Sequence, residues 1–448
     1  MTKIDPSRGI GLCVALCFPL MTWAQTPPTS APAAPAPMWR LEPAAGDAAV
    51  RGTLSLSQAL ALAHAQNPEL AASRLELEAM AGASQQAQSR PNPEIAYLLE
   101  DTQRQMRTTT LQLNQPIELG GKRAARMLAA ERGHDIAAEE LAAKRLAIRA
   151  SVTSGYYDAL TAQERVRLAE QAMELAQRAS RAAGQRVKAG KVAPIEETKA
   201  HVAQAGVQVE LSQARSEWVG AQARLAALLG EPGGLSWRLD AQLDALPAVP
   251  STAELERSLD NAPSLRRARL EIDRRQALTE LEKARRIPDI TVSLGAKRSE
   301  ELGRNQAILG LSVPLPIFDT NRGNLLEALK REEKAREELS ASQLQVSAEA
   351  RETRERLASL RQEAQLFAEQ VLPGAQSAYD AAAKGFELGK FSFLEALDAQ
   401  RTLLQARSQY LRTLAATHRA RADLDRLLGL EESTETPLAS AAVRRTGE

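Results

Sequence analysis

Apolar residues recur at alternating spacings of four and three along two long stretches of the chain. The first stretch runs from about 121 to 189, contains no proline and is rich in alanine, arginine, glutamate and glutamine, which are strong helix formers. Its apolar seam is typical of a coiled coil and predicts a helix on the order of 100 Å long, at about 1.5 Å per residue. A second such stretch runs from about 321 to 388, where Pro373 should kink or locally unwind the helix.

Two shorter regions alternate between apolar and polar residues, which is typical of strands with one apolar face. The first is a predicted hairpin over 94–116, in which Tyr97 and Leu111 lie on the apolar face and Gln112 lies on the polar face. The second predicted hairpin covers 289–316. Each hairpin precedes one of the two long helices.

The elements come in the same order twice, and short segments recur with them. The recurring pairs are 67–70 with 262–265, 93–95 with 288–290, 187–192 with 386–391, and 228–230 with 427–429. A period of roughly two hundred residues is too long for a solenoid repeat, so each copy must be a substantial set of elements. The chain is therefore expected to consist of two equivalent halves.

Helix lengths indicate how each half is built. A helix of about 22 residues before the hairpin and one of about 36 after a glycine turn together match the long helix, at about 1.5 Å per residue. The two shorter helices can therefore stack end to end along the long one. Each half would then be a rod with a strand hairpin at one end and a helix–helix turn at the other.

The N-terminus is typical of an export signal, because Lys3 and Arg8 precede an apolar run and a small-residue cleavage site that ends at Ala24. A lipoprotein acylated at Cys17 is an alternative, although the apolar run continues past that residue. Both cysteines, Cys13 and Cys17, lie in this segment, so the mature chain would have neither disulfides nor thiolate metal sites. The expected organisation is a signal peptide at 1–24, a Pro/Ala-rich linker at 25–52, repeat 1 at 53–230, a connecting equatorial segment at 231–250, repeat 2 at 251–430 and a flexible tail at 431–448.

Composition and motifs argue against catalysis and against nucleic-acid binding. Acidic and basic residues nearly cancel, to a formal net charge of +1, and no basic block stands out. The segment 120–122 (GGK) lacks both the leading glycine and the following Ser or Thr of a phosphate-binding loop. We expect no enzyme activity, no cofactor and no metal site, because no nucleophile–base pair is visible and no metal-ligand spacing links His64, His134, His201 and His418.

Outside the N-terminus, no stretch approaches the roughly 18 consecutive apolar residues of a membrane-spanning helix, so any crossing must use strands. Two strands per half give four per chain, and the open edges of a four-stranded sheet cannot face lipid. Three chains would supply twelve strands, enough for a closed barrel with a hollow interior.

The chain resembles the TolC family of outer-membrane efflux channels in its two-fold repeat and in three segments, 115–123 (QPIELGGKR), 314–319 (PLPIFD) and 394–400 (LEALDAQ). The first segment is most like the cobalt-zinc-cadmium, heavy-metal branch of that family. The resemblance implies a mainly α fold with a small β part. Long coiled-coil helices would form an α-helical barrel, and four strands per chain would complete a 12-stranded β-barrel in a homotrimer.

The same resemblance implies a function and partners. The protein would be the exit duct of a tripartite efflux system that exports divalent heavy-metal cations. It would lie in the outer-membrane lipid of a Gram-negative bacterium and extend into the periplasm. There it would dock onto a periplasmic adaptor and, through the adaptor, onto an inner-membrane pump of the resistance-nodulation-division class.

Two sets of candidate site residues follow from the resemblance. Glu395 and Asp398 match family carboxylates at the pore entrance; at i and i+3 they share a helix face, and three copies would form stacked acidic rings that favour cations. The alternative is a solvated helix start, where the helix dipole favours acidic residues. The first half has Glu196 and Lys199 at the equivalent positions, so only one repeat would carry the ring. The adaptor-docking tips would be Ala189, Gly190 and Lys191 in the first half and Leu388, Gly389 and Lys390 in the second.

Two other functions remain open at this point. The channel could serve multidrug efflux or type I secretion, because duct sequences differ little with cargo. The protein could instead be a periplasmic coiled-coil adaptor or scaffold without membrane strands. Adaptors usually have one helical hairpin between two β-rich flanks, whereas helix pairs occur twice here.

Overall fold

The computed structural model describes residues 52–430 except 102, 232–236, 241–245 and 389. The predicted signal peptide and tail, nearly all of the predicted linker, and Gly389 therefore lie outside the described residues. The helices of the first half are α1 (Leu56–Gln66), α2 (Pro68–Gln88), α3 (Lys122–Lys188) and α4 (Pro194–Leu229). The second half contains α5 (Thr252–Leu259), α6 (Pro263–Arg285), α7 (Arg322–Leu366), the π-helix η1 (Phe367–Val371), α8 (Leu372–Glu387) and α9 (Phe393–Leu428).

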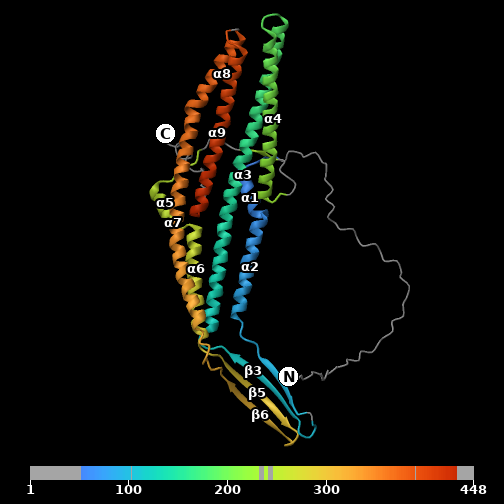
Figure 1. Ribbon diagram of the computed structural model, residues 1–448, viewed down its shortest axis with the longest axis vertical. Coiled ribbons are helices and arrows are strands. Elements are labelled where there is room, and N and C mark those ends of the chain that lie inside the picture. The colour runs from blue at the N-terminus through green and yellow to red at the C-terminus, as the bar shows by residue number, and fades with distance from the viewer. Residues whose placement is uncertain (1–51, 102, 232–236, 241–245, 389, 431–448) are drawn as a thin grey trace, which may run out of the picture. The chain divides into compact units, whose positions relative to one another are not determined.

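Four strands form one antiparallel sheet in the order β2 (Glu94–Glu100), β3 (Thr108–Ile117), β5 (Ile290–Ser299) and β6 (Arg304–Ser312). The two hairpins are joined by the pairing of β3 with β5, so both halves contribute to one sheet. Figure 1 shows this sheet at one end of α3 and the two helix–helix turns at the other end. The two-fold repeat expected from the sequence is thus confirmed in the order of the elements.

The second long helix is interrupted where the sequence contains Pro373. Proline lacks a backbone N–H, so one helical hydrogen bond is lost in the turn that precedes it. At this place the helix contains a five-residue π-helix, Phe367–Val371, between α7 and α8. The local unwinding predicted at this proline is therefore confirmed.

Helix α3 is the common neighbour of both halves, because it packs against α2 and α4 of its own half and against α6 and α9 of the other. The seam residues Val152 and Ala159 are fully buried, together with Leu225 from α4. The equivalent core of the second half contains Leu357 from α7 and Leu424 from α9. Alanines along the seam allow the helix axes to approach closely.

The segments that recur in the sequence meet in space at the joint of the first half. Asn67 caps α2, since its Oδ1 accepts the backbone N–H groups of Glu69 at 2.9 Å and Leu70 at 3.2 Å. Its Nδ2 donates to the carbonyl of Leu228 at the end of α4, at 2.9 Å. Gly230 ends α4 with φ +77°, and a Cβ there would lie 2.6 Å from the carbonyl oxygen of Gln66. The end of α4 therefore meets the start of α2, and the two helices together line α3, as their lengths predicted.

The second half has the same joint with different polar contacts. Gly429 ends α9 with φ +70°, and a Cβ there would lie 2.8 Å from the carbonyl oxygen of Asn261 and 3.2 Å from Pro263. Ala262 precedes α6 and has no side chain that can cap it. The first joint therefore has a polar cap that the second lacks.

A two-stranded parallel sheet of β1 (Thr53–Leu54) and β4 (Arg238–Leu239) was not predicted from the sequence. It is held against α3 by Tyr156, whose buried hydroxyl donates to the Leu54 carbonyl at 2.8 Å and also contacts the Asp240 carbonyl. Gln163 adds hydrogen bonds to both backbone groups of Leu239. In the second half, Arg354 of α7 holds the connecting segment instead, by donating to the Pro250 carbonyl at 2.9 Å.

Candidate functional site

One face of the four-stranded sheet is apolar and exposed. Ile95, Leu113, Leu294 and Leu309 lie in register across the four strands, and each side chain is 44% to 80% exposed. Further exposed apolar side chains flank this row on the strands or directly after them: Tyr97, Leu99, Leu111, Leu311 and Val313. Soluble proteins rarely expose a contiguous apolar patch of this kind without a partner or a membrane to cover it. The alternation predicted for both hairpins is confirmed.

The other face of the sheet is mostly polar, although the exposed Leu98 lies on it, and it carries its own hydrogen bonds. The Asn114 Oδ1 accepts from Gln112 Nε2 at 2.8 Å and from the Ser293 hydroxyl at 2.7 Å. Ser293 is directly opposite Asn114 in the register. The sheet therefore separates an apolar side from a side that can face water. Its outer strands, β2 and β6, have no second strand partner among the described residues.

The segment 115–123 joins β3 to α3 and contacts the second half of the chain. The Asp289 Oδ1, at the start of β5, accepts from the backbone N–H of Leu119 at 3.0 Å and from Lys122 Nζ at 2.7 Å. Gly120 has φ +70°, and a Cβ there would lie 2.8 Å from the Ile287 Cβ and 2.9 Å from the Ala284 carbonyl oxygen. This segment is thus a tight strand-to-helix turn between the halves, and not a phosphate-binding loop.

Arg126 supports the same turn from inside α3. Its guanidinium donates to both carboxylate oxygens of Glu118, at 2.6 and 3.1 Å, and to the backbone carbonyls of Ala87 and Ser89 at 3.1 and 2.9 Å. The end of α2 and the start of α3 are therefore held together directly above the sheet. The sequence pattern alone gave no sign of this four-bond network.

The first predicted tip lies between α3 and α4. Ala189, Gly190 and Lys191 are all exposed. Gly190 has φ +67°, and the N–H groups of Gly190 and Lys191 bond back to the carbonyls of Val187 and Arg186, both at 2.9 Å. No atom lies within 4 Å of a Cβ built on Gly190, so within this chain the turn needs glycine for its backbone angle and not for close approach.

The second tip lies between α8 and α9 and is closed in a related way. Leu388 and Lys390 are exposed, and the Lys390 N–H donates to the Gly385 carbonyl at 2.8 Å. The ring of Phe391 covers Gly385 so closely that a Cβ on Gly385 would force the ring to move. Exposed backbone turns thus end both helix pairs.

A contact between the two tips was not predicted from the sequence. The guanidinium carbon of Arg186 lies 4.3 Å from the centroid of the Phe386 ring, and its Nη2 donates to the Phe386 carbonyl at 3.2 Å. Ala183 and Ala200 pack next to this contact. One arginine therefore joins the ends of the two halves by a cation–π contact and a hydrogen bond.

Glu395 and Asp398 are both exposed in the first turns of α9, at the tip end of the helix. Glu395 closes a capping box, because its Oε2 accepts from the Ser392 N–H at 2.6 Å while its own N–H donates to the Ser392 hydroxyl at 3.3 Å. Hydrogen bonds from Ser392 lower the pKa of Glu395, so the group stays ionised. In the first half, Lys199 neutralises Glu196 at 3.1 Å. Among the described residues, no ion pair compensates Glu395 or Asp398, so the acidic pair of the second half keeps its charge where Glu196 of the first half is paired.

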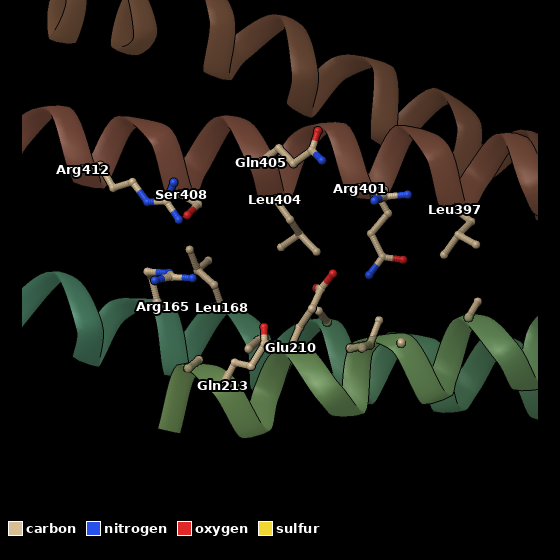
Figure 2. Close-up of a pocket in the computed structure, with 17 residues that line it drawn as sticks. Arg165, Leu168, Glu210, Gln213, Leu397, Arg401, Leu404, Gln405, Ser408 and Arg412 are labelled. Carbon is tan, nitrogen blue, oxygen red and sulfur yellow. The ribbon is translucent and has the colours of Figure 1, made fainter. Parts of the chain in front are cut away.

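A groove of about 490 Å³ separates the helices of the two halves on the tip side of the molecule. Figure 2 shows Arg165 and Leu168 of α3 and Glu210 of α4 facing Leu404 and Arg412 of α9 across it. Its lining is mixed, because Leu168 and Leu404 are apolar whereas Glu210, Arg401 and Arg412 are charged.

Among the described residues, no three His, Cys, Asp or Glu side chains lie close enough together to hold a metal ion. His418 stacks on Tyr157, with ring centroids 3.8 Å apart, and so contributes to the packing of α9 on α3.

None of the described helices is both long enough and apolar enough to cross a membrane.

A family match and similarity to individual proteins both relate this chain to outer-membrane efflux proteins. The family described as "Outer membrane efflux protein" matches residues 59–231 and 255–430, one match in each half. The chain is 45% identical to the cobalt-zinc-cadmium resistance protein CzcC of Cupriavidus metallidurans over 378 residues, which cover 84% of this chain and 90% of the relative. It is 28% identical to the nickel-cobalt-cadmium resistance protein NccC of Alcaligenes xylosoxydans xylosoxydans, over 66% of this chain and 68% of the relative.

Solved structures resemble the fold at low sequence identity. A crystal structure of CusC, from work on conformational changes accompanying folding and transmembrane channel formation, gives a TM-score of 0.72 at 18% identity, covering 84% of this chain and 92% of that one. The outer membrane protein VceC of Vibrio cholerae gives 0.69 at 19% identity, covering 84% and 96%. The two helix pairs and the shared sheet are therefore an architecture seen in other proteins.

Proposed function

Because the chain belongs to the outer membrane efflux protein family, we propose that three copies of it form the exit duct of a tripartite system that exports divalent heavy-metal cations. The relatives at 45% and 28% identity are resistance proteins for cobalt, zinc and cadmium and for nickel, cobalt and cadmium. Their names support metal ions as the cargo of this chain also. The ions are cargo that passes through, so the duct needs no tight binding site for them.

The observation that carries the proposal is the four-stranded sheet with an apolar face, a polar face and two free edges. Unpaired backbone groups on a sheet edge cost several kcal/mol each in lipid. Association of copies satisfies these groups, and three sheets of four strands close into twelve, which leave a hollow interior. The apolar row through Ile95 and Leu309 would then face lipid, and the polar row through Asn114 and Ser293 would face the water-filled bore.

The helix pairs would continue the duct through the periplasm to the pump. The exposed residues of the two tips, 189–191 in the first half and Leu388 and Lys390 in the second, and a groove that both halves line, support docking of a periplasmic adaptor and, through it, of an inner-membrane pump of the resistance-nodulation-division class. Lys191→Glu with Lys390→Glu should weaken cross-linking to the adaptor in cells. A matched reversal at the exposed Lys334, on α7, should not. Equal cross-linking of all variants would show that the tips are not part of the docking surface.

Glu395 and Asp398 are proposed to face the duct near its periplasmic entrance, where three copies would make a cation-selective ring. Since Glu395 also caps α9, alanine would change the fold and the charge together. Glu395→Gln keeps a capping acceptor and removes the charge, and Asp398→Asn is its isosteric companion. The double variant should show weaker cation preference in single-channel recordings in planar bilayers. Unchanged preference would refute the acidic ring.

The cargo is tested by disrupting the gene. Loss of the duct should lower the concentrations of zinc, cobalt and cadmium that the cells tolerate, and a plasmid copy should restore them. Lost tolerance to organic drugs with unchanged tolerance to metals would instead indicate multidrug efflux. A chain that fractionates away from the outer membrane would favour a periplasmic scaffold.

A further inference from the structure

The junction between β6 and α7 exposes apolar side chains that none of the described residues covers. Leu315 is 75% exposed, Ile317 is 70% exposed and Phe318 is completely exposed. The segment follows β6, one of the two strands at a free edge of the sheet. An apolar turn at this place is a surface for a partner.

The equivalent junction of the first half, between β3 and α3, packs against the second half of the chain. Ile117 pairs with Ile290 at the end of the β3–β5 ladder. Directly after it, Leu119 N–H and Lys122 Nζ bind the Asp289 carboxylate, at 3.0 and 2.7 Å. The β3–α3 junction of one half therefore sits on the α6–β5 junction of the other.

The two halves can be superposed residue by residue at these junctions. Pro116-Ile117 recurs as Pro316-Ile317, and the residues before α3 and α7, Gly121 and Asn321, both have left-handed backbone angles, φ +77° and +56°. The hairpin registers agree with this alignment. Ala96 pairs with Gln112 in the first hairpin, and their counterparts Thr291 and Ser312 pair in the second.

We propose that the β6–α7 junction docks onto the α2–β2 junction of a second copy of this chain by the contact that joins the two halves within one chain. Ile317 then lies opposite Ile95 of the neighbouring copy, as Ile117 lies opposite Ile290 within the chain. Arg322 binds Glu94 of the neighbouring copy, as Lys122 binds Asp289 within the chain. The inference rests on the trimer of the proposed function and adds to it the register and the residues of the contact.

The chemistry of the counterparts fits this contact. Arg322 takes the place of Lys122 and Glu94 takes the place of Asp289, so the pair keeps its opposite charges. Arg322 and Glu94 are both exposed, and neither has an ion-pair partner among the described residues. Their charges have the same signs as those of Lys122 and Asp289, whose Nζ and Oδ1 atoms lie 2.7 Å apart within the chain.

The predicted register also keeps the sheet faces consistent. Continued from Ile317 back towards the end of β6 at Ser312, it places Leu315 opposite Tyr97 and Val313 opposite Leu99 of the neighbouring copy. These four side chains are exposed apolar residues, and Tyr97 and Leu99 belong to the apolar face of the sheet. A register shifted by one residue would turn one strand over and place apolar opposite polar side chains. Lipid could cover the apolar turn but would leave Glu94 and Arg322 without partners.

Cysteine pairs test the register in intact outer membranes. Ile95→Cys with Ile317→Cys should give dimers and trimers on denaturing gels after oxidation, because the predicted mature chain has no cysteine of its own. Ile95→Cys with Phe318→Cys is the matched control, shifted by one residue, and should stay monomeric on the same gels. Trimers on native gels without linkage at 95 and 317, or with linkage only in the shifted pair, would overturn the inference and leave the proposed duct intact. Absence of any trimer would overturn both.

Charge exchange tests the ion pair without depending on disulfide geometry. Glu94→Arg and Arg322→Glu should each lower the fraction of assembled trimer several-fold, and the double exchange should restore most of it. Folding of each variant is checked by its circular dichroism. Single exchanges that assemble as well as the wild type, or a double exchange that assembles no better than the single ones, would overturn the ion pair.

Discussion

Two adjacent glycines offer a direct test of the turn that joins β3 to α3. Gly120 and Gly121 both have left-handed backbone angles, φ +70° and +77°. A Cβ on Gly120 would lie 2.8 Å from the Ile287 Cβ and 2.9 Å from the Ala284 carbonyl oxygen, whereas a Cβ on Gly121 would have nothing within 4 Å. Alanine at either position thus meets the same backbone strain, but only at position 120 does it meet the other half of the chain.

The two substitutions should therefore differ by the packing cost alone. A non-glycine residue in the left-handed region costs about 1–2 kcal/mol. Forcing an extra methyl group into a packed contact typically adds about 1–3 kcal/mol. We expect Gly121→Ala to lower the free energy of unfolding by about 1–2 kcal/mol, and Gly120→Ala to lower it by about 2–5 kcal/mol.

The assay is denaturant unfolding of the purified protein in detergent, followed by the helical circular dichroism signal. The unfolding midpoint should fall in the order wild type, Gly121→Ala, Gly120→Ala. Because β3–α3 and α6–β5 are held together by this turn, Gly120→Ala should also expose Asp289 and weaken its bond to Lys122. Equal midpoints for the two variants, or a larger loss for Gly121→Ala, would refute the close packing at Gly120.

Three further substitutions test other contacts. Tyr156→Phe removes the hydroxyl that bonds the Leu54 carbonyl and contacts the Asp240 carbonyl, and should cost about 1–3 kcal/mol at neutral pH, measured by denaturant unfolding. Burial raises the pKa of Tyr156 to about 12, so the wild type should lose stability as the pH rises from about 10 to about 12, because the unfolded chain gives up this proton first. Tyr156→Phe should lack that part of the pH dependence, and identical alkaline profiles would contradict the buried hydroxyl. Asn67→Ala removes the cap of α2 and its bond to α4, and should cost about 1–2 kcal/mol in the same assay; a loss within error would show that the joint does not need the cap. Arg186→Ala removes the cation–π contact to the half-buried Phe386, worth about 0.5–2 kcal/mol, and should raise hydrogen exchange at both tips; unchanged exchange would mean that the two tips do not stabilise each other.

The fold could be predicted to this extent because its signals are long and periodic. The seam of α3 continues over many turns, and the strands alternate over enough residues to fix their faces. The end-to-end stacking of α2 and α4 could be predicted from the helix lengths alone. Pro373 predicted the interruption of the second long helix, because a proline lacks the backbone N–H that the helical hydrogen bond needs.

Contacts between distant residues could not be predicted in this way. The β1–β4 pair has two residues in each strand, too few for any period, and it depends on Tyr156, which is far away in the sequence. The Arg186–Phe386 contact joins residues two hundred positions apart, and nothing in either local sequence indicates it. Glu395 is a different case, because the spacing Ser392-x-x-Glu395 is itself a capping-box pattern and could have shown its structural role beforehand.

The mass of the protein in detergent tests the central claim most directly, because a four-stranded sheet with two free edges cannot close on itself. Light scattering combined with absorbance gives the mass of the protein part of the complex, without the detergent. We predict a particle of three chains that keeps this mass on dilution. A stable, folded particle of a single chain would contradict the account, since its sheet edges would then need no second copy.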